Sequence, residues 1–197
     1  MIPRGFPGRL PEGETLLWQG APDWRILART ALHTRTLGLY FAALACLAGV
    51  TGHMTGALSV AGLGLVPLVL AYGYAWAVSR SSVYSITNKR VVLHIGLAFQ
   101  VTLNLPLERV AAADVRAGAG GSGDLSLTLA GADRFAYVVL WPHARPWHFA
   151  RAQPTMRGLA DVAQPAQILA RALGASAPAL PNVMEPEYKT MQRPLAA

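Results

Sequence analysis

The stretch that decides the fold is TLGLYFAALACLAGVTGHMTGALSVAGLGLVPLVLAYGYAWAVS, residues 36–79. It contains no Asp, Glu, Lys or Arg, and a polar break at residues 51–56 falls near its middle. A membrane-spanning helix needs about 20 predominantly apolar residues, so the stretch is long enough for two. It predicts a transmembrane hairpin with a first helix over residues 36–51 and a second over residues 57–79.

Small and aromatic residues support the hairpin. Small residues recur every three or four positions and therefore share one face of each helix, where they allow close packing in lipid. They are Gly38, Ala42, Ala45 and Gly49 in the first helix, and Ala57, Ala61, Gly64, Ala71 and Ala75 in the second. Aromatic residues open the first helix (Tyr40, Phe41) and close the second (Tyr72, Tyr74, Trp76). An antiparallel pair should bring these two groups to the same membrane interface.

Basic residues lie outside the apolar stretch and predict its orientation. Arg25, Arg29 and Arg35 precede it, and Arg80, Lys89 and Arg90 follow it. Because such residues favour the cytoplasmic side, we expect the short loop to be translocated and both termini to be cytoplasmic. Asp23 is a suitable N-cap for an interfacial helix beginning at Trp24. We interpret the basic face of that helix (Arg25, Arg29, His33) as an orientation signal rather than a ligand site. A buried helix pair in a soluble protein is the alternative, which we disfavour because such helices are usually amphipathic.

The net charge of +7 and the isoelectric point near 10.2 raise the question of nucleic-acid binding. No Lys/Arg-rich block or aromatic RNA-binding signature is present, so we expect no nucleic-acid partner. Charge next to a membrane segment is explained by orientation and by attraction to anionic lipid. The single cysteine, Cys46, lies within the first predicted span, which leaves no internal disulfide.

After Ser79 the pattern changes to short segments of alternating polarity, which is typical of half-buried antiparallel strands. The segments lie near residues 83–87, 91–95, 101–105, 110–116, 125–129 and 135–141. Such a meander must curl to bury its apolar face, so a small barrel or roll is expected. A helix over residues 159–173, or one that starts at Pro165, would cap the open end, and Gly174 is a suitable C-cap. The predicted fold class is an α+β membrane protein.

Four regions follow from these patterns. Residues 1–22 form an N-terminal segment, in which the apolar patch at residues 16–18 could add a strand or clamp to the soluble domain. Residues 23–80 hold the interfacial helix and the hairpin, and residues 81–174 form the β-rich domain. Residues 175–197 contain four prolines and little periodicity, and we expect a disordered tail.

Residues 84–91 (YSITNKRV), Gly96 and residues 105–110 (LPLERV) resemble the bacterial pleckstrin-homology domains of membrane-anchored proteins. The resemblance implies a curled seven-stranded sheet capped by a C-terminal helix. Many members also carry a Gly-Glu…Trp-x-Gly segment ahead of a two-helix anchor, which matches residues 13–20 here.

A closer resemblance covers nearly the whole chain. Residues 10–14 (LPEGE), 17–24 (LWQGAPDW) and 140–147 (LWPHARPW) are similar to the photosynthetic complex assembly proteins of purple bacteria. The resemblance implies a non-enzymatic factor in the photosynthetic inner membrane, including its intracytoplasmic (chromatophore) part. Its expected partners are subunits of the reaction centre and of the core light-harvesting complex. A generic envelope protein whose domain binds lipid headgroups is the alternative.

Residues 118–123 (GAGGSG) match the Gly-x-Gly-x-x-Gly pattern of dinucleotide sites. Such a site needs a helix directly after the loop, whereas a strand is predicted here, so we expect a hairpin loop. The five histidines and Cys46 show no zinc-site spacing, and no catalytic grouping recurs. We therefore expect no metal, cofactor or catalysis. His53, in the predicted loop, could ligate a magnesium tetrapyrrole, although loop polarity explains it as well.

The candidate partner-binding residues lie between Pro142 and Arg157. They are Arg145, Trp147, His148, Phe149 and Arg151. Aromatic residues next to arginine are enriched at protein interfaces. The alternative is that Trp147 and Phe149 cover the end of the barrel beside the capping helix. The small-residue faces of the hairpin offer a second surface, for a partner helix or for a second copy of the chain.

Overall fold

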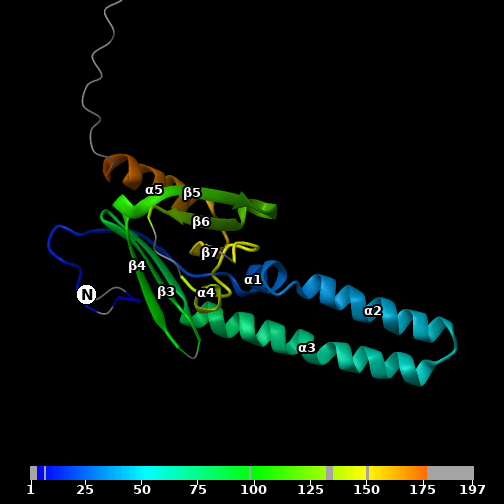
Figure 1. The fold of residues 1–197 in the computed structure, drawn as a ribbon. Coiled ribbons are helices and arrows are strands. Elements are labelled where there is room, and N and C mark those ends of the chain that lie inside the picture. Colours follow the sequence, from blue (N-terminus) through cyan, green and yellow to red (C-terminus); the bar gives the residue numbers. More distant parts are fainter. Residues whose placement is uncertain (1–3, 7, 98, 132–134, 150, 177–197) are drawn as a thin grey trace, which may run out of the picture.

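A computed structural model describes residues 4–6, 8–97, 99–131, 135–149 and 151–176. Figure 1 shows a β-rich domain from which two long helices project side by side. The helices are α1 (Trp24–Thr30), α2 (Thr34–Val50), α3 (Met54–Ser81), α4 (Tyr137–Leu140) and α5 (Ala163–Ser176). The strands are β1 (Leu16–Gly20), β2 (Val83–Thr87), β3 (Arg90–Ile95), β4 (Val101–Pro106), β5 (Val110–Ala117), β6 (Gly123–Leu129) and β7 (Thr155–Leu159). Two short 3-10 helices, η1 (Leu107–Arg109) and η2 (Ala119–Gly121), flank β5.

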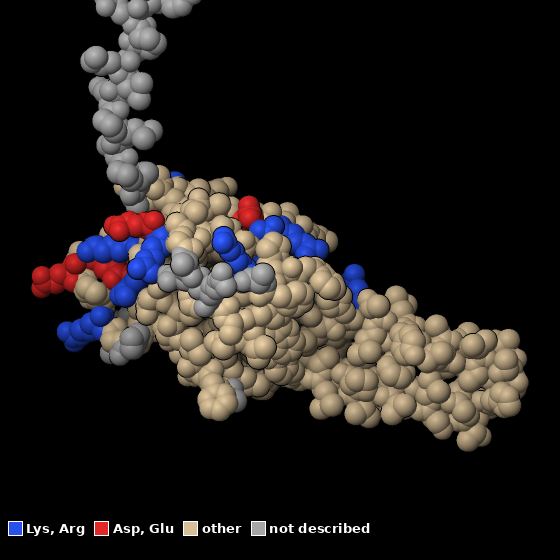
Figure 2. All heavy atoms as spheres, in the orientation of Figure 1, with Lys and Arg blue, Asp and Glu red and all other residues tan. Residues whose placement is uncertain are grey.

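The projecting helices α2 and α3 form the predicted antiparallel hairpin. Figure 2 shows no charged side chain on the visible face of the hairpin beyond its base. Only 6% of the most apolar window of α3 is buried, so this part of α3 is not packed into the core of the β-rich domain. By length and composition α3 could cross a membrane, whereas α2 does so only together with α1, from which it is bent by 60°.

Small residues lie where the two helices touch. A side chain on Gly64 would come within 2.5 Å of the Phe41 side chain, so glycine lets that ring lie against α3. The expectation that the aromatic residues of both helices lie at the same membrane interface is only partly correct. The Thr34 hydroxyl lies 3.3 Å from the Tyr72 hydroxyl at the base of the hairpin, but Phe41 meets Gly64, about two turns further along α3. The 17-residue α2 begins at Thr34, well before Tyr40 and Phe41. These two aromatic residues therefore lie further from the base of the hairpin than Tyr72 does.

The strands form two antiparallel sheets, which agrees with the expected two-layer roll and not with a single closed barrel. The first has the order β1-β2-β3-β4 and the second the order β5-β6-β7. The chain passes from one sheet to the other at η1, where Leu107 is buried. The inner faces of both sheets share one hydrophobic core, in which Leu125 and Leu127 are fully buried. Leu169 brings α5 onto this core, so the prediction of a capping C-terminal helix is confirmed.

Two predicted elements are wrong. Residues 135–141 were expected as a strand but contain α4, because the place beside β6 is filled by β7. The capping helix begins at Ala163 rather than near residue 159, because residues 155–159 form β7. The Asp161 carboxylate accepts hydrogen bonds from the first turn of α5. Gly174 lies within α5 rather than at its cap, and residues 177–197 of the predicted tail lie outside the described residues.

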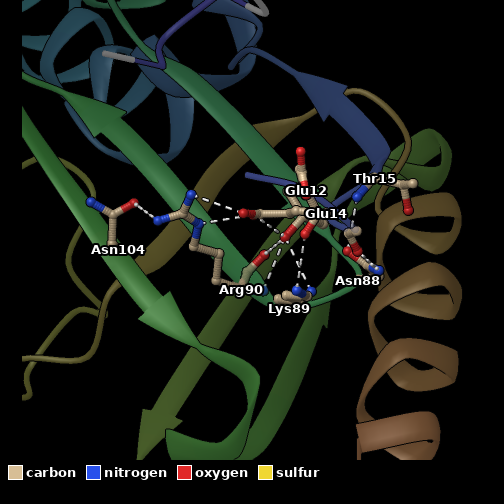
Figure 3. Close-up of polar contacts among 9 residues, drawn as sticks. Glu12, Glu14, Thr15, Asn88, Lys89, Arg90 and Asn104 are labelled. Atoms are coloured by element: carbon tan, nitrogen blue, oxygen red, sulfur yellow. Dashed lines mark hydrogen bonds and ion pairs between the residues drawn. The ribbon is translucent and has the colours of Figure 1, made fainter. Parts of the chain in front are cut away.

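The N-terminal segment is clamped to the domain at the turn between β2 and β3. β1 pairs with β2, which confirms the predicted extra strand. The Glu14 side chain is 2% exposed, and both of its oxygens lie 2.9 Å from the guanidinium of Arg90. The Thr87 hydroxyl donates to Glu14 at 2.8 Å, and the Asn88 side chain bonds the backbone at Gly13 and Thr15. Figure 3 shows Glu14 pointing into this group of β2 and β3 residues.

Replacing Glu14 with alanine should lower the free energy of unfolding by about 1–3 kcal/mol. The change leaves Arg90 without its carboxylate, although the 29% exposure of the Arg90 side chain lets water compensate in part. Urea unfolding of the full chain in detergent micelles, followed by tryptophan fluorescence, measures the loss. Glu12→Ala is the matched control, since among the described residues the Glu12 carboxylate has no ion-pair partner. Equal stability of the two variants would contradict the clamp.

Candidate partner-binding surface

The predicted partner-binding residues lie on the loop between α4 and β7. An isolated bridge between Ala144 and Pro154 closes the base of this loop. The Arg145 guanidinium donates to the Asp114 carboxylate at 2.7 Å and to the Gln153 side chain at 2.9 Å. Arg145 therefore fixes the loop to β5 as well as to its own return strand.

Trp147 stands out from this loop on a strained backbone. Its φ of 66° lies in the left-handed region, which is an outlier for a bulky side chain. The side chain is 86% exposed, and that of Phe149 is 62% exposed. Neither side chain covers the core, so the interpretation that they merely close the end of the barrel does not hold. An exposed tryptophan held in a costly conformation is a feature that packing alone does not explain.

Aromatic rings continue from this loop to the base of the helix hairpin. Trp147 meets Phe149 with ring centroids 6.2 Å apart, and Phe149 meets Tyr137 at 4.7 Å. Tyr137 begins α4, and Trp141, which follows α4, stacks on Tyr74 of α3 at 5.4 Å. We call these five residues the aromatic row. The row has two parts, Trp147–Phe149–Tyr137 and Trp141–Tyr74. Val138 and Val139 of α4, which lie between Tyr137 and Trp141 in the chain, also have exposed side chains.

The remaining predicted residues have different environments. The His148 ring is 2.9 Å from the carbonyl oxygen of Pro146, which holds the ring against its own loop. Arg151 is exposed, and within the described part of the chain no carboxylate pairs with it. Arg157, which the sequence placed beside this group, is buried in β7 with 4% exposure. Sequence reasoning missed the exposed Trp141, and the half-buried Tyr137 that contacts Phe149, because it assigned both to a strand.

A buried polar network joins the domain to the helices behind this surface. The His143 Nδ1 lies 2.7 Å from the Tyr84 hydroxyl, and its Nε2 lies 3.2 Å from the hydroxyl of Ser82, the C-cap residue of α3. The short distance favours donation from Tyr84 to Nδ1, so we assign the His143 proton to Nε2. Ser82 and His143 are 0% and 1% exposed, so substrate cannot reach them. In a Ser-His-Asp catalytic triad a carboxylate would orient the histidine, whereas Tyr84 takes that position here. We interpret the pair as structural.

Arg157 connects this network to α1. Its guanidinium donates to the carbonyl oxygen of Pro142 at 3.2 Å and to that of Thr30 at 3.1 Å. Its Nε lies 3.7 Å from the Asp124 carboxylate, an ion pair without a hydrogen bond at that nitrogen. The Asp124 carboxylate also accepts a hydrogen bond from the backbone N–H of Gly158. The Gly158 carbonyl oxygen in turn accepts a hydrogen bond from the backbone N–H of Asp23, at 2.7 Å. These contacts fix the direction in which the hairpin leaves the domain.

Burial sets the protonation states in the network. Burial first, and the positive charge of Arg157 second, lower the pKa of His143 to about 3. Burial also raises the pKa of the Tyr84 hydroxyl well above its usual range. Both groups are therefore neutral at physiological pH, so that Arg157 and Asp124 carry the only charges of the network.

The comparison with protein families gives a clear result. The bacterial PH domain family matches residues 35–173, a range that includes the helix hairpin, both sheets except β1, and most of α5. The chain belongs to this family. The pleckstrin-homology resemblance seen in the sequence is therefore confirmed.

Two individual proteins are similar to this bacterial PH domain protein. One is described as an uncharacterized 23.7 kDa protein in the puhA 5' region of Rhodobacter capsulatus. It is 38% identical over 178 residues, which cover 85% of this chain and 83% of the relative. The other is a solved structure from Shewanella loihica PV-4, a DUF1696 family protein with a pleckstrin-homology domain. It is 14% identical, with a TM-score of 0.32, and the match covers 47% of this chain and 71% of that structure.

The His143 pKa predicts how stability depends on pH. The unfolded chain binds a proton near pH 6.5, whereas folded His143 does so only near pH 3. Between these values the unfolded state binds more protons, so stability falls as the pH is lowered, by up to about 1.4 kcal/mol per pH unit. Urea unfolding between pH 7 and pH 5 should show this slope in the native chain and a smaller slope in His143→Gln. Identical slopes would contradict the neutral buried imidazole.

Proposed function

We propose that the chain is a membrane-anchored, non-enzymatic assembly factor for the photosynthetic reaction centre and its core light-harvesting complex. It would act by binding subunits or assembly intermediates at the cytoplasmic face of the bacterial inner membrane. The aromatic row carries this proposal, since Trp147, Phe149 and Trp141 are exposed, while the half-buried Tyr137 and Tyr74 connect them to the domain and to the base of the hairpin. Such side chains are typical anchors of protein interfaces.

The family and the relative support the proposed setting. The chain belongs to the bacterial PH domain family, and its Rhodobacter capsulatus relative is encoded in the 5' region of puhA, a photosynthesis gene. Such a gene position is consistent with a role in photosynthesis. The similarity of residues 10–24 and 140–147 to photosynthetic complex assembly proteins supplies the finer proposal. Residues 140–147 include Trp141 and Trp147 of the aromatic row.

The helix hairpin supports membrane anchoring. The 28-residue α3 is about 42 Å long, whereas the hydrocarbon core of a bilayer is about 30 Å thick. The extra length lies at the domain end, where Ala75 and Val78 pack against Leu27 and Ala28 of α1. The uncharged part of α3 would then fill the bilayer, and its last turns would hold the domain close to the lipid surface. The aromatic row would lie at the same level as the juxtamembrane parts of a partner.

Changing Trp147 and Phe149 together to alanine should reduce recovery of reaction-centre and light-harvesting subunits about tenfold. The measurement is affinity purification of the tagged full chain from solubilised photosynthetic membranes. Phe99→Ala is the matched control, because Phe99 is 88% exposed on the loop between β3 and β4, outside the aromatic row. Unchanged recovery from the double variant would remove this surface from the proposal. Recovery of lipid alone by the native chain would favour the generic lipid-binding envelope protein.

Membrane orientation can be tested with single cysteines in a Cys46→Ala background. His53→Cys, at the tip of the hairpin, should react with a membrane-impermeant maleimide in intact spheroplasts. Arg9→Cys, in the N-terminal segment, should react only after lysis. The reason is that the basic flanks keep both termini in the cytoplasm. Labelling of both positions from the same side, or recovery of the chain in the soluble fraction, would contradict the proposed anchor.

A further inference from the structure

A second site lies between α1 and the hairpin that joins β5 to β6. A cavity of about 340 Å³ opens there, at the lower end of the size range of ligand pockets. One wall is formed by Ile26, Arg29, Thr30 and His33, and the other by Arg116, Ala117, Gly118, Ser122, Gly123 and Asp124. The cavity does not include any residue of the aromatic row.

The wall of this cavity carries two positive charges, from Arg29 and Arg116, and one negative charge, from Asp124. Among the residues that the structure describes, neither Arg29 nor Arg116 has an ion-pair partner. The only carboxylate in the wall belongs to Asp124, which is buried and already engaged by Arg157 and the backbone of Gly158. Two guanidinium groups that lack an ion-pair partner among the described residues are suited to a phosphate group, which arginine binds through paired hydrogen bonds.

The Gly-rich stretch at residues 118–123 places Arg116 in this wall. It forms the turn between β5 and β6, as predicted, and does not lead into a helix. A side chain on Gly123 would approach the carbonyl oxygen of Arg116, so glycine is required for the close pairing of the two strands. The motif therefore acts by bringing a strand with a free arginine over α1, and not as a nucleotide-binding loop.

The cavity lies at the end of the domain from which the helices project. In Figure 1 the turn of β5 and β6 extends over α1 on the side of α2 and α3. His33, in the cavity wall, has a φ of 52° and is the N-cap of α2. The uncharged stretch begins three residues later, at Thr36. If the hairpin is anchored as proposed above, the cavity faces the level of the lipid phosphates.

We propose that this cavity binds the phosphodiester of an anionic phospholipid, with Arg29 and Arg116 as the two cationic contacts. The Arg29 guanidinium, on α1 at the base of the hairpin, and the Arg116 guanidinium, on β5, would hold one phosphate between them. A bound lipid would thus bridge the two parts of the molecule. The inference uses the proposed anchoring but not the proposed protein partners.

The test is native mass spectrometry of the purified full chain in a neutral detergent. Phosphatidylglycerol and phosphatidylcholine are added in turn, and the retained lipid is counted. The native chain should retain phosphatidylglycerol in preference to phosphatidylcholine, and the double variant Arg29→Gln, Arg116→Gln should lose about tenfold in apparent affinity. The double variant Arg25→Gln, Arg35→Gln is the matched control, because it also removes two positive charges from α1 and the start of α2 but from outside the cavity.

The outcomes separate the lipid from other sources of phosphate. Glycerol phosphate, added as a soluble competitor, should displace phosphatidylglycerol only weakly, since it lacks the acyl chains that hold the headgroup at the cavity. Displacement at equal concentration would mean that the site takes a free phosphate ester and would overturn the lipid assignment. Equal loss in the Arg25→Gln, Arg35→Gln control would indicate diffuse charge attraction and would overturn the site. Undiminished retention of phosphatidylglycerol by the Arg29→Gln, Arg116→Gln variant, with its free energy of unfolding unchanged, would also overturn the site.

Discussion

The structure depends on one buried cation at the joint between the helices and the domain. Arg157 enters from β7 and binds carbonyl oxygens at the end of α1 and in the turn that leads to the aromatic loop. A buried guanidinium is costly to desolvate and is tolerated only when its hydrogen bonds are supplied by fixed groups. Because those groups come from three separate parts of the chain, satisfying the charge also sets their relative positions. His143 and Tyr84 extend the same network to the end of α3 while remaining neutral.

This joint explains why two different surfaces lie close to the base of the hairpin. The aromatic row continues from the loop after α4 to Tyr74 of α3. The basic cavity lies between α1 and the turn of β5 and β6. A rigid connection to the hairpin would hold both surfaces at a constant height above the lipid.

The N-terminal segment completes the domain from a distance. Glu14 pairs with Arg90, and both helices of the hairpin lie between these two residues in the sequence. β1 extends the first sheet at its edge. The Gly-Glu…Trp-x-Gly pattern thus has a physical explanation: glycine adopts a φ of 72° at Gly13, and the next residue supplies the buried carboxylate. The family match begins at residue 35 and does not include this segment. The helices α1, α2 and α3 therefore connect two neighbouring strands of one sheet, β1 and β2.

The sequence by itself determined the elements whose physics is local. The uncharged stretch of residues 36–79 specified the hairpin, and Asp23 specified the start of α1. Period-two alternation specified five of the seven strands, β2 to β6, and the apolar patch at residues 16–18 indicated β1. Local patterns could not decide which segment fills the place beside β6. Residues 135–141 alternate in polarity as a strand would, but β7 pairs with β6 instead. In this position β7 buries Met156 in the core and Arg157 in its polar network. The tertiary structure alone decided that Trp147 is exposed, that Arg157 is buried, and that Arg29 and Arg116 share a cavity. Each of these depends on contacts between residues far apart in the chain, which neither composition nor periodicity records.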